Sequence, residues 1–399
     1  MKGDGTRPTS PAAAWLILAV LLLFSVAAPL NQFKVPPILP ILMEALDLSV
    51  SRAGLLMSVY SLTGLILALP SGLIYQKVGP RATGLLAGGS IVLGAALGAL
   101  STSTGTLLAS RVIEGIGTGF MAVLAPAIIA QWFATRQRGT AMGIWAIWVP
   151  IGSATMVFLA PALAQGAGWR AVWWLGAGYA LLVTLLYLAL VPPAATVRSI
   201  QAIPAPAGST VTSSQVLRDH NLWLLAAAFA AHCASATGGS TYLSTFLTSQ
   251  RGLSLTQAAL ISSVGTLIGL FSSPAGGVLS DRIGSRKKPF VFGLACSVVL
   301  LPLVGFVDVA GVIVLMVLQG LMFGMVATNI LAAAVEAAGD ERQGGAAMAV
   351  IMVGQNAGML LGPVIFGALV EGPGWPLAYV SLAVLAASGV LAAWLAKVR

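Results

Sequence analysis

Charged residues are scarce in this 399-residue chain. Only 8% of its residues are Asp, Glu, Lys or Arg, and 58% are hydrophobic. Soluble domains carry roughly a quarter charged residues, and a soluble fold could not bury so much apolar surface. The composition therefore excludes an ordinary soluble enzyme or binding domain. It predicts a protein whose helices face the lipid bilayer and one another.

Cysteine and histidine are equally scarce, with two of each. This number supplies neither a disulfide framework nor the ligand spacing of a metal site, so we expect no metal and no cofactor. The chain has no G-x-x-x-x-G-K-[ST] loop, which argues against ATP as the energy source. It also lacks a clustered nucleophile and base, and we expect no enzyme activity.

Long apolar runs fill the chain instead. A helix needs about 20 such residues to cross the hydrocarbon. Runs such as 14–26 and 180–191 do not alternate polar and apolar residues, as the strands of a membrane barrel would. Twelve transmembrane helices are predicted, at 13–45, 50–75, 82–101, 106–132, 140–163, 170–192, 221–249, 254–279, 288–307, 310–335, 344–369 and 375–396.

The net charge of +9 invites a nucleic-acid partner, but its distribution argues against one. With twelve spans and a cytoplasmic N-terminus, fifteen of the twenty Lys and Arg residues fall on the cytoplasmic side. This asymmetry is the positive-inside bias of membrane proteins. It predicts a multi-pass protein of the inner or plasma membrane with both termini in the cytoplasm. The other five basic residues are Lys34, Arg52, Arg111, Arg170 and Arg251.

One 29-residue segment occurs twice. AGLLMSVYSLTGLILALPSGLIYQKVGPR (53–81) recurs as AALISSVGTLIGLFSSPAGGVLSDRIGSR (258–286) at a constant offset of 205, with ten identities. A repeat of this period indicates two equivalent halves, as in many secondary transporters. The polar stretch 194–220, rich in Pro, Ser and Thr, has the composition of a flexible linker. The predicted parts are a cytoplasmic tail (1–12), two six-helix bundles (13–193 and 221–399) and this cytoplasmic linker between them.

The loops that end the two copies carry a family resemblance. GGVLSDRIGSRKK (276–288) matches G-x-L-x-D-R-x-G-x-[RK], and GLIYQKVGPR (72–81) is its partner copy. RVIEGIGTG (111–119) resembles an R-x-x-x-G-x-G pattern on a fourth helix. Over about 13–397 the chain resembles the major facilitator superfamily (MFS) of transporters. The resemblance implies an all-α fold of two pseudo-symmetric six-helix bundles that work by alternating access around a central site.

In similar transporters the two basic glycine loops latch the cytoplasmic side, and basic residues there also serve topology. Gln76 stands where the second copy has Asp281, so we expect the first latch to be weaker. The predicted gating residues are Gly72, Gln76, Lys77, Gly79, Arg81, Gly277, Asp281, Arg282, Gly284 and Arg286.

Charge inside a membrane span is costly and indicates function, and the candidates in the predicted spans are Arg111, Glu114 and Lys34. Arg111 and Glu114 are three apart and share a helix face. They either neutralise each other, or Arg111 binds an anion while Glu114 exchanges a proton. Lys34 either snorkels to the outer interface or faces the cavity if the helix bends at Pro36-Pro37. The positive balance favours an anionic substrate over a cationic drug.

Neutral polar groups complete the predicted substrate site, although histidine and amides also serve as packing or bridging groups. The predicted substrate-binding residues are Arg111, Lys34, Asn31, Trp148, His232, Tyr242, Gln355 and Asn356, with Glu114 coupling a proton. The predicted function is a monomeric secondary active transporter, favoured as a symporter, for a carboxylate or small inorganic anion. The alternatives are an efflux antiporter for hydrophobic compounds, with Glu114 as its proton site, and a non-transporting receptor or scaffold of the same fold.

Overall fold

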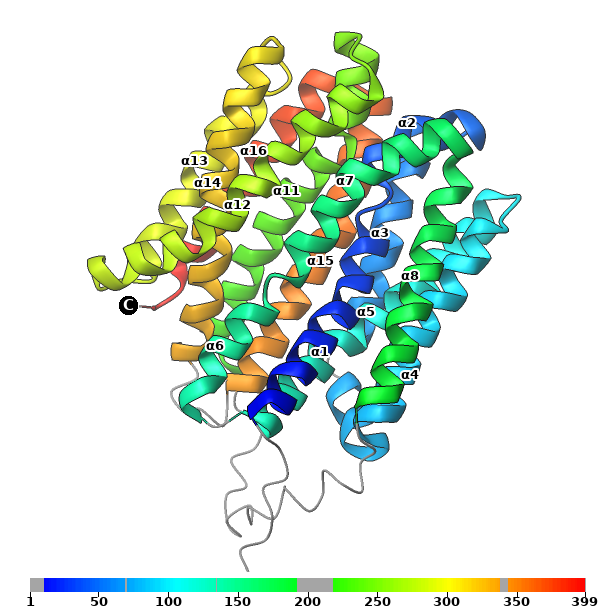
Figure 1. The fold of residues 1–399 in the computed structure, drawn as a ribbon. Helices are drawn as coiled ribbons and strands as arrows, with labels where there is room; N and C mark the ends of the chain where they lie inside the picture. The colour runs from blue at the N-terminus through cyan, green and yellow to red at the C-terminus, as the bar shows by residue number, and fades with distance from the viewer. Residues whose placement is uncertain (1–10, 69, 134, 192–217, 338–343, 399) are drawn as a thin grey trace, which may run out of the picture.

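A computed structural model of the protein describes residues 11–68, 70–133, 135–191, 218–337 and 344–398. Within these ranges every regular element is a helix (Figure 1). Eleven of the helices are long and apolar enough to cross a membrane. A further apolar helix, α13 (Lys287–Leu303), has 17 residues and occupies the predicted ninth span. The predicted all-α membrane fold is confirmed.

Within the described ranges, the first half has eight α-helices and one short 3-10 helix, and the second half has six helices. The first-half elements are α1 (Pro11–Gln32), η1 (Pro36–Ile38), α2 (Leu39–Ala45), α3 (Val50–Leu67), α4 (Pro70–Ala99), α5 (Thr104–Trp132), α6 (Thr135–Trp145), α7 (Trp148–Ala167) and α8 (Trp169–Leu190). The second-half helices are α11 (His220–Arg251), α12 (Leu255–Ile283), α13, α14 (Val309–Ala337), α15 (Gly344–Glu371) and α16 (Trp375–Leu395). Most of the predicted linker, residues 194–217 of 194–220, lies outside the described ranges.

The first predicted span is broken. A continuous helix over 13–45 is wrong at residues 33–35, because α1 ends at Gln32 and the chain resumes as η1 at Pro36. Proline offers no N–H to the preceding turn and disfavours helical geometry in the residue before it. The fifth span breaks as well, between α6 and α7. The first break matters for function, because Lys34 lies in it.

The glycines of the repeated loop sit at two sharp turns. Gly79 has φ 79° at a kink within α4, and Gly284 has φ 67° just after α12. Only glycine adopts this left-handed region without strain. Residues 70–78 are helical and lead up to the kink at Gly79. The predicted second span, 50–75, is therefore too long, because α3 ends at Leu67 and α4 begins at Pro70.

The internal repeat extends beyond the segment found in the sequence. Helices α5 and α14 both have 29 residues and start 205 apart (309 minus 104), the offset of the repeated segment. In this register Glu114 corresponds to Gln319, and Arg111 corresponds to Met316. The charged pair of the fourth helix is therefore confined to the first half.

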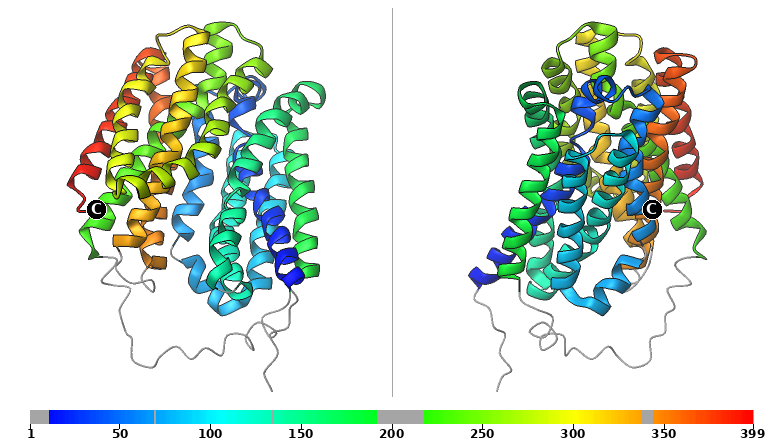
Figure 2. Two further views of the ribbon diagram at one scale, coloured as in Figure 1. Left: turned by 60° about the vertical axis from the view of Figure 1, so that its left-hand side comes forward. Right: turned by 90° about the vertical axis from the view of Figure 1, so that its right-hand side faces the viewer.

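The apolar cores show how the halves meet. We call the side where α1 begins and α16 ends the terminal side, and the side where α2 ends and α3 begins the far side (Figure 1). On the far side one core joins both halves, with Leu42 and Leu56 from the first and Phe246 and Phe366 from the second. On the terminal side each half has its own core. The two bundles are therefore packed together on the far side and separate towards the terminal side, as the two views of Figure 2 illustrate.

Candidate functional site

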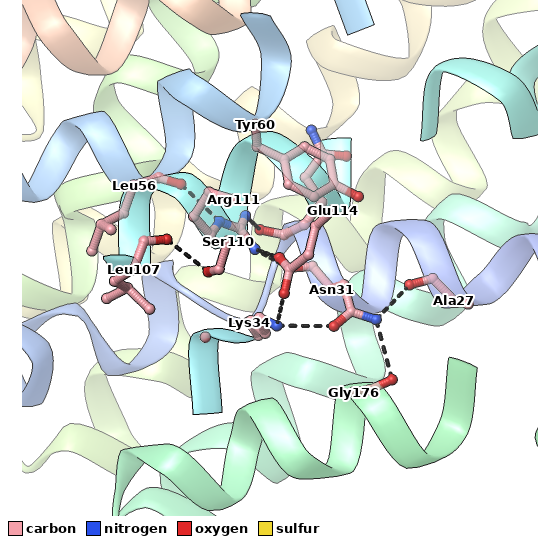
Figure 3. A network of polar contacts seen from close by, with 12 residues as sticks. Ala27, Asn31, Lys34, Leu56, Tyr60, Leu107, Ser110, Arg111, Glu114 and Gly176 are labelled. Atoms are coloured by element: carbon pink, nitrogen blue, oxygen red, sulfur yellow. Dashed lines mark hydrogen bonds and ion pairs between the residues drawn. The ribbon is translucent and has the colours of Figure 1, made fainter. Parts of the chain in front are cut away.

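Three charged side chains meet inside the first half, each with 0% of its surface exposed. The ammonium of Lys34 lies 2.6 Å from Glu114 Oε1, and Arg111 Nη1 pairs with Glu114 Oε2 (Figure 3). We call Lys34, Arg111 and Glu114 the charge cluster. Of the two positions considered for Lys34, the structure has the inward one. Arg111 and Glu114 do pair, as one of the two sequence interpretations expected.

Local structure explains how the charge cluster assembles. Arg111 and Glu114 are one turn apart on α5, and the break after α1 turns Lys34 inward. Asn31 Oδ1 accepts a hydrogen bond from Lys34 at 2.9 Å, while Asn31 Nδ2 donates to Ala27 O at 2.9 Å and to Gly176 O at 3.4 Å. Asn31 therefore ties Lys34 to α1 and α8. The structure brings three of the predicted binding residues to Glu114, but their roles stay predictions.

A glycine on α4 makes room for the carboxylate. A Cβ atom on Gly94 would lie 2.7 Å from both Cγ and the backbone nitrogen of Glu114. Such separations do not occur between real side chains. The bare backbone of Gly94 is thus a packing requirement of the charge cluster.

Most hydrogen-bond donors of Arg111 are already occupied. Its Nη1 donates to Asn31 O at 2.7 Å and its Nη2 to Gln32 O at 3.1 Å, which are the last two residues of α1. The final carbonyls of a helix have no partner within the helix, so Arg111 closes the end of α1. Its Nε donates to Leu56 O at 2.9 Å. Arg111 thus fastens α1 and α3 to α5 in this conformation.

Aromatic and hydroxyl groups that the sequence reasoning missed surround the charge cluster. Trp173 lies 4.5 Å from the Lys34 ammonium, and the Tyr60 ring lies 4.5 Å from the Arg111 guanidinium. The Tyr60 hydroxyl donates to Ala28 O at 2.9 Å and lies 2.5 Å from Thr118 Oγ1. One sequence signal could have drawn attention to Tyr60, because the second copy of the repeat has Gly265 at the matching position.

The second half presents a neutral counterpart. His232 is fully buried, with its ring centroid 5.0 Å from that of Phe323 and 6.2 Å from that of Phe229. Among the described residues, neither ring nitrogen of His232 has a hydrogen-bond partner. On α14, one turn before Phe323, Gln319 Nε2 donates to Ser297 Oγ at 3.2 Å. Its carbonyl oxygen also has no partner.

Two other predicted binding residues lie between the halves, away from the charge cluster. The Tyr242 hydroxyl donates to Val50 O at 2.9 Å and lies 3.1 Å from Pro363 O, on the far side. Asn356 Nδ2 donates to Met352 O at 2.9 Å, and its Oδ1 faces Gly64 of α3.

Gln355 is partly buried within α15, and its side chain makes no hydrogen bond to another described residue. Trp148 stacks on Trp145 at 5.3 Å beside the break in the fifth span. The structure therefore places neither residue against the charge cluster.

The predicted gating loops make their contacts within their own halves. Arg286 Nη1 lies 2.6 Å from Asp281 Oδ1, and its Nε lies 2.8 Å from Glu336 Oε1. These bonds, with Glu336 foremost, raise the pKa of Arg286 above its usual value. Arg81 instead donates to Leu188 O at 2.9 Å. The charged bridge thus belongs to the second copy.

The remaining gating residues add little to this picture. The side chains of Lys77 and Arg282 are exposed, and Gly72 and Gly277 lie within α4 and α12. The side chain of Gln76 lies outside what the structure describes. Among the described residues, no group of three or more His, Cys, Asp or Glu side chains gathers as a metal site would need.

Two packed helical bundles with buried charges between membrane-spanning helices define a secondary transporter of the membrane. The chain belongs to the Major Facilitator Superfamily, whose family model matches residues 16–346 and 274–399. The resemblance seen in the sequence is confirmed. The protein is a multi-pass membrane transporter of this family.

Relatives span nearly the whole chain. An uncharacterized MFS-type transporter of Mycobacterium tuberculosis is 28% identical over 93% of this chain and 83% of its own length. A probable sulfoacetate transporter of Cupriavidus necator and a hexuronate transporter of Bacillus subtilis are each 24% identical, over 90% of this chain and 88% of theirs.

A solved structure shares the fold. It is a bacterial homolog of the human lysosomal transporter Spinster in an inward-facing and occupied conformation. The TM-score is 0.81 over 98% of both chains, at 15% sequence identity.

Proposed function

We propose that this transporter moves a small organic anion across the cell membrane by alternating access, in symport with protons. The observation that carries the proposal is the charge cluster, in which two cations share one carboxylate with no surface exposed. A buried charge without a partner is costly. A site with one cation in excess therefore favours an anionic occupant.

The position of the charge cluster supports a transport role. Leu30 and Leu56 belong to the core shared by both halves, whereas Ala27 and Met121 belong to the separate core of the first half. The charge cluster lies between the core shared by both halves and the separate core of the first half. Because the basic residues place the termini in the cytoplasm, the terminal side is the cytoplasmic side in this proposal. The closed far side then faces out.

Two relatives support the anionic class. Two transporters similar to this chain are named for sulfoacetate and for hexuronate. Hexuronate carries one carboxylate, and sulfoacetate carries a sulfonate and a carboxylate. Carboxylates pair readily with guanidinium and ammonium groups. We therefore take a carboxylate as the substrate class, with Arg111 and Lys34 as its recognition groups.

Substrate binding would also affect the end of helix α1. An anion that draws Arg111 away from Glu114 also disturbs its bonds to Asn31 O and Gln32 O. The end of α1 would then be free to move, which links anion binding to rearrangement of the first half. Glu114 serves coupling in this proposal, because it is the charge with which the anion competes.

Uptake into proteoliposomes tests the proposal. The probes are labelled galacturonate, sulfoacetate and phosphate, with tetraphenylphosphonium as a lipophilic cation, each with and without a pH gradient. We expect uptake of an anion that rises with an inward proton gradient and is lost in Arg111→Ala and Glu114→Gln. Arg170→Ala is the matched control, since Arg170 binds Ser101 O near the far-side surface.

Two outcomes would contradict the proposal. Transport of the lipophilic cation alone, unchanged in Arg111→Ala, would replace it with drug efflux. Proton-driven accumulation that survives Glu114→Gln would remove the coupling role of that residue.

A further inference from the structure

The formal charges of the charge cluster do not cancel. Lys34 and Arg111 contribute two positive charges and Glu114 one negative charge, which leaves one positive charge in excess, and all three side chains are fully buried. The far side is closed over the cluster by the shared core. An empty transporter that crosses between its two states in this form would carry an uncompensated charge through the membrane, which is costly.

In the part of the chain that the structure describes, the surrounding elements bring no further charged partner to Lys34. Asn31 on α1 and Trp173 on α8 are uncharged, and the phenol of Tyr60 on α3 lies against Arg111. Helix α7, which packs against α1, contains no ionisable residue. On α11, the hydroxyl of Tyr242 is bound to carbonyls of α3 and α15, and the ring of His232 lies between two phenylalanines. The charges that act on Lys34 are those of Glu114 and Arg111.

Only one change of protonation removes the excess. Arginine does not lose its proton in proteins. A proton added to Glu114 would raise the sum from one positive charge to two. A proton released from Lys34 would bring the sum to zero.

The contacts of Lys34 fit the neutral amine as well as the ammonium. Its Nζ has two hydrogen-bond acceptors, Asn31 Oδ1 at 2.9 Å and Glu114 Oε1 at 2.6 Å. A neutral amine has two N–H groups and can keep both bonds. The ammonium has a third N–H, and the remaining neighbour is the ring of Trp173, 4.5 Å away. Releasing the proton therefore breaks no hydrogen bond, although it removes the charge attraction to Glu114 and the cation–π contact with Trp173.

We propose that Lys34 is the proton carrier of this transporter, neutral when the site is empty and protonated when an anion of single negative charge is bound. Glu114 then keeps its negative charge and takes part in coupling as the counter-charge with which the anion competes, so that Lys34 exchanges the proton in place of Glu114. The inference rests on the proposed anion transport and names its coupling group and the charge of its substrate. The lone pair of Nζ takes a proton from water on the loading side, the anion neutralises the ammonium, and both leave on the other side. One proton accompanies each anion, and neither loaded nor empty cluster carries net charge.

The variant Lys34→Arg tests this proposal, because it keeps the positive charge and cannot release its proton. Labelled galacturonate, which carries one negative charge, is the probe in proteoliposomes. Exchange of external for internal galacturonate needs only the loaded form, so we expect Lys34→Arg to reduce exchange less than it reduces net uptake. Net uptake needs return of the empty form, and we expect it to fall about tenfold or more, because that form now carries a charge. Lys287→Arg is the matched control at a surface lysine that binds the Trp394 and Ala396 carbonyls.

The outcomes separate this inference from the function on which it rests. Galacturonate exchange with lost net uptake in Lys34→Arg supports it. Net proton-driven uptake that survives in Lys34→Arg overturns it while leaving anion transport intact. If none of the anion probes is transported by the wild type, the proposed function fails and this inference fails with it.

A second measurement decides the case in which Lys34→Arg loses exchange as well. Wild-type net uptake is then measured under a membrane potential imposed with potassium and valinomycin. Uptake that does not respond to the potential supports one proton per anion. Uptake that changes with the imposed potential overturns the proposed stoichiometry of one proton per anion.

Discussion

Glu371 caps the first turn of α3 from the opposite half of the protein. Its Oε1 accepts a hydrogen bond from the backbone N–H of Ser51 at 2.8 Å, while Ser49 Oγ in the same half accepts one from Arg52 at 3.4 Å. A carboxylate at a helix N-terminus satisfies a free N–H and the helix dipole together. The Tyr242–Val50 hydrogen bond joins the same two halves nearby. Both contacts must break when the far side opens.

Removing the carboxylate should favour opening of the far side. We expect Glu371→Ala to increase the far-side-open population about threefold, since one exposed hydrogen bond to a charged group contributes modestly. Glu371→Gln keeps an acceptor oxygen and serves as the matched control, with a smaller shift. Pulsed electron–electron double resonance measures the change as the distance between two spin labels. The labels are placed at Glu44 and Asp308, which are both exposed. Identical distance distributions in all three proteins would exclude a latch at Glu371.

The charge cluster predicts an order of stability among its own variants. Lys34→Met leaves the balanced Arg111–Glu114 pair, so we expect a small loss of about 1 kcal/mol or less. Glu114→Gln leaves the buried guanidinium of Arg111 with no counter-charge, and breaking a buried pair in this way costs about 3–5 kcal/mol. Thermal unfolding of the purified protein in detergent gives the order directly. A larger loss in Lys34→Met than in Glu114→Gln would contradict the charge balance described for the site.

Gly94→Ala tests the packing behind Glu114. The new Cβ would lie 2.7 Å from the Glu114 backbone and side chain, and overpacking of this kind costs about 1–3 kcal/mol. We expect a lower melting temperature together with impaired transport. Gly89→Ala is the control on the same helix, because a Cβ there meets no atom within 4 Å. Equal effects of the two substitutions would mean that the tight contact is not specific to the charge cluster.

The sequence predicted the architecture better than the site. The duplicated segment and the apolar runs predicted two helical halves, since a repeat and hydropathy are properties of local sequence. The pairing of Lys34 with Glu114 joins residues 80 apart, and it depends on where α1 stops. Tyr60 and Trp173 contact the cluster only through packing of α3 on α5 and of α8 on α1 and α4. Such contacts follow from tertiary structure, which no local pattern encodes.

His232 offers a test of the second half. Its two ring nitrogens are buried without partners, a cost of about 1–3 kcal/mol. His232→Phe keeps a flat ring between Phe229 and Phe323 and removes the unpaired polar atoms, so we expect a higher melting temperature. If His232 binds substrate in another state, the same variant should lose affinity for galacturonate, seen as a raised KM for uptake. The exposed His220 gives the control variant His220→Phe. A more stable variant with unchanged KM would assign His232 to packing and leave substrate recognition to the first half.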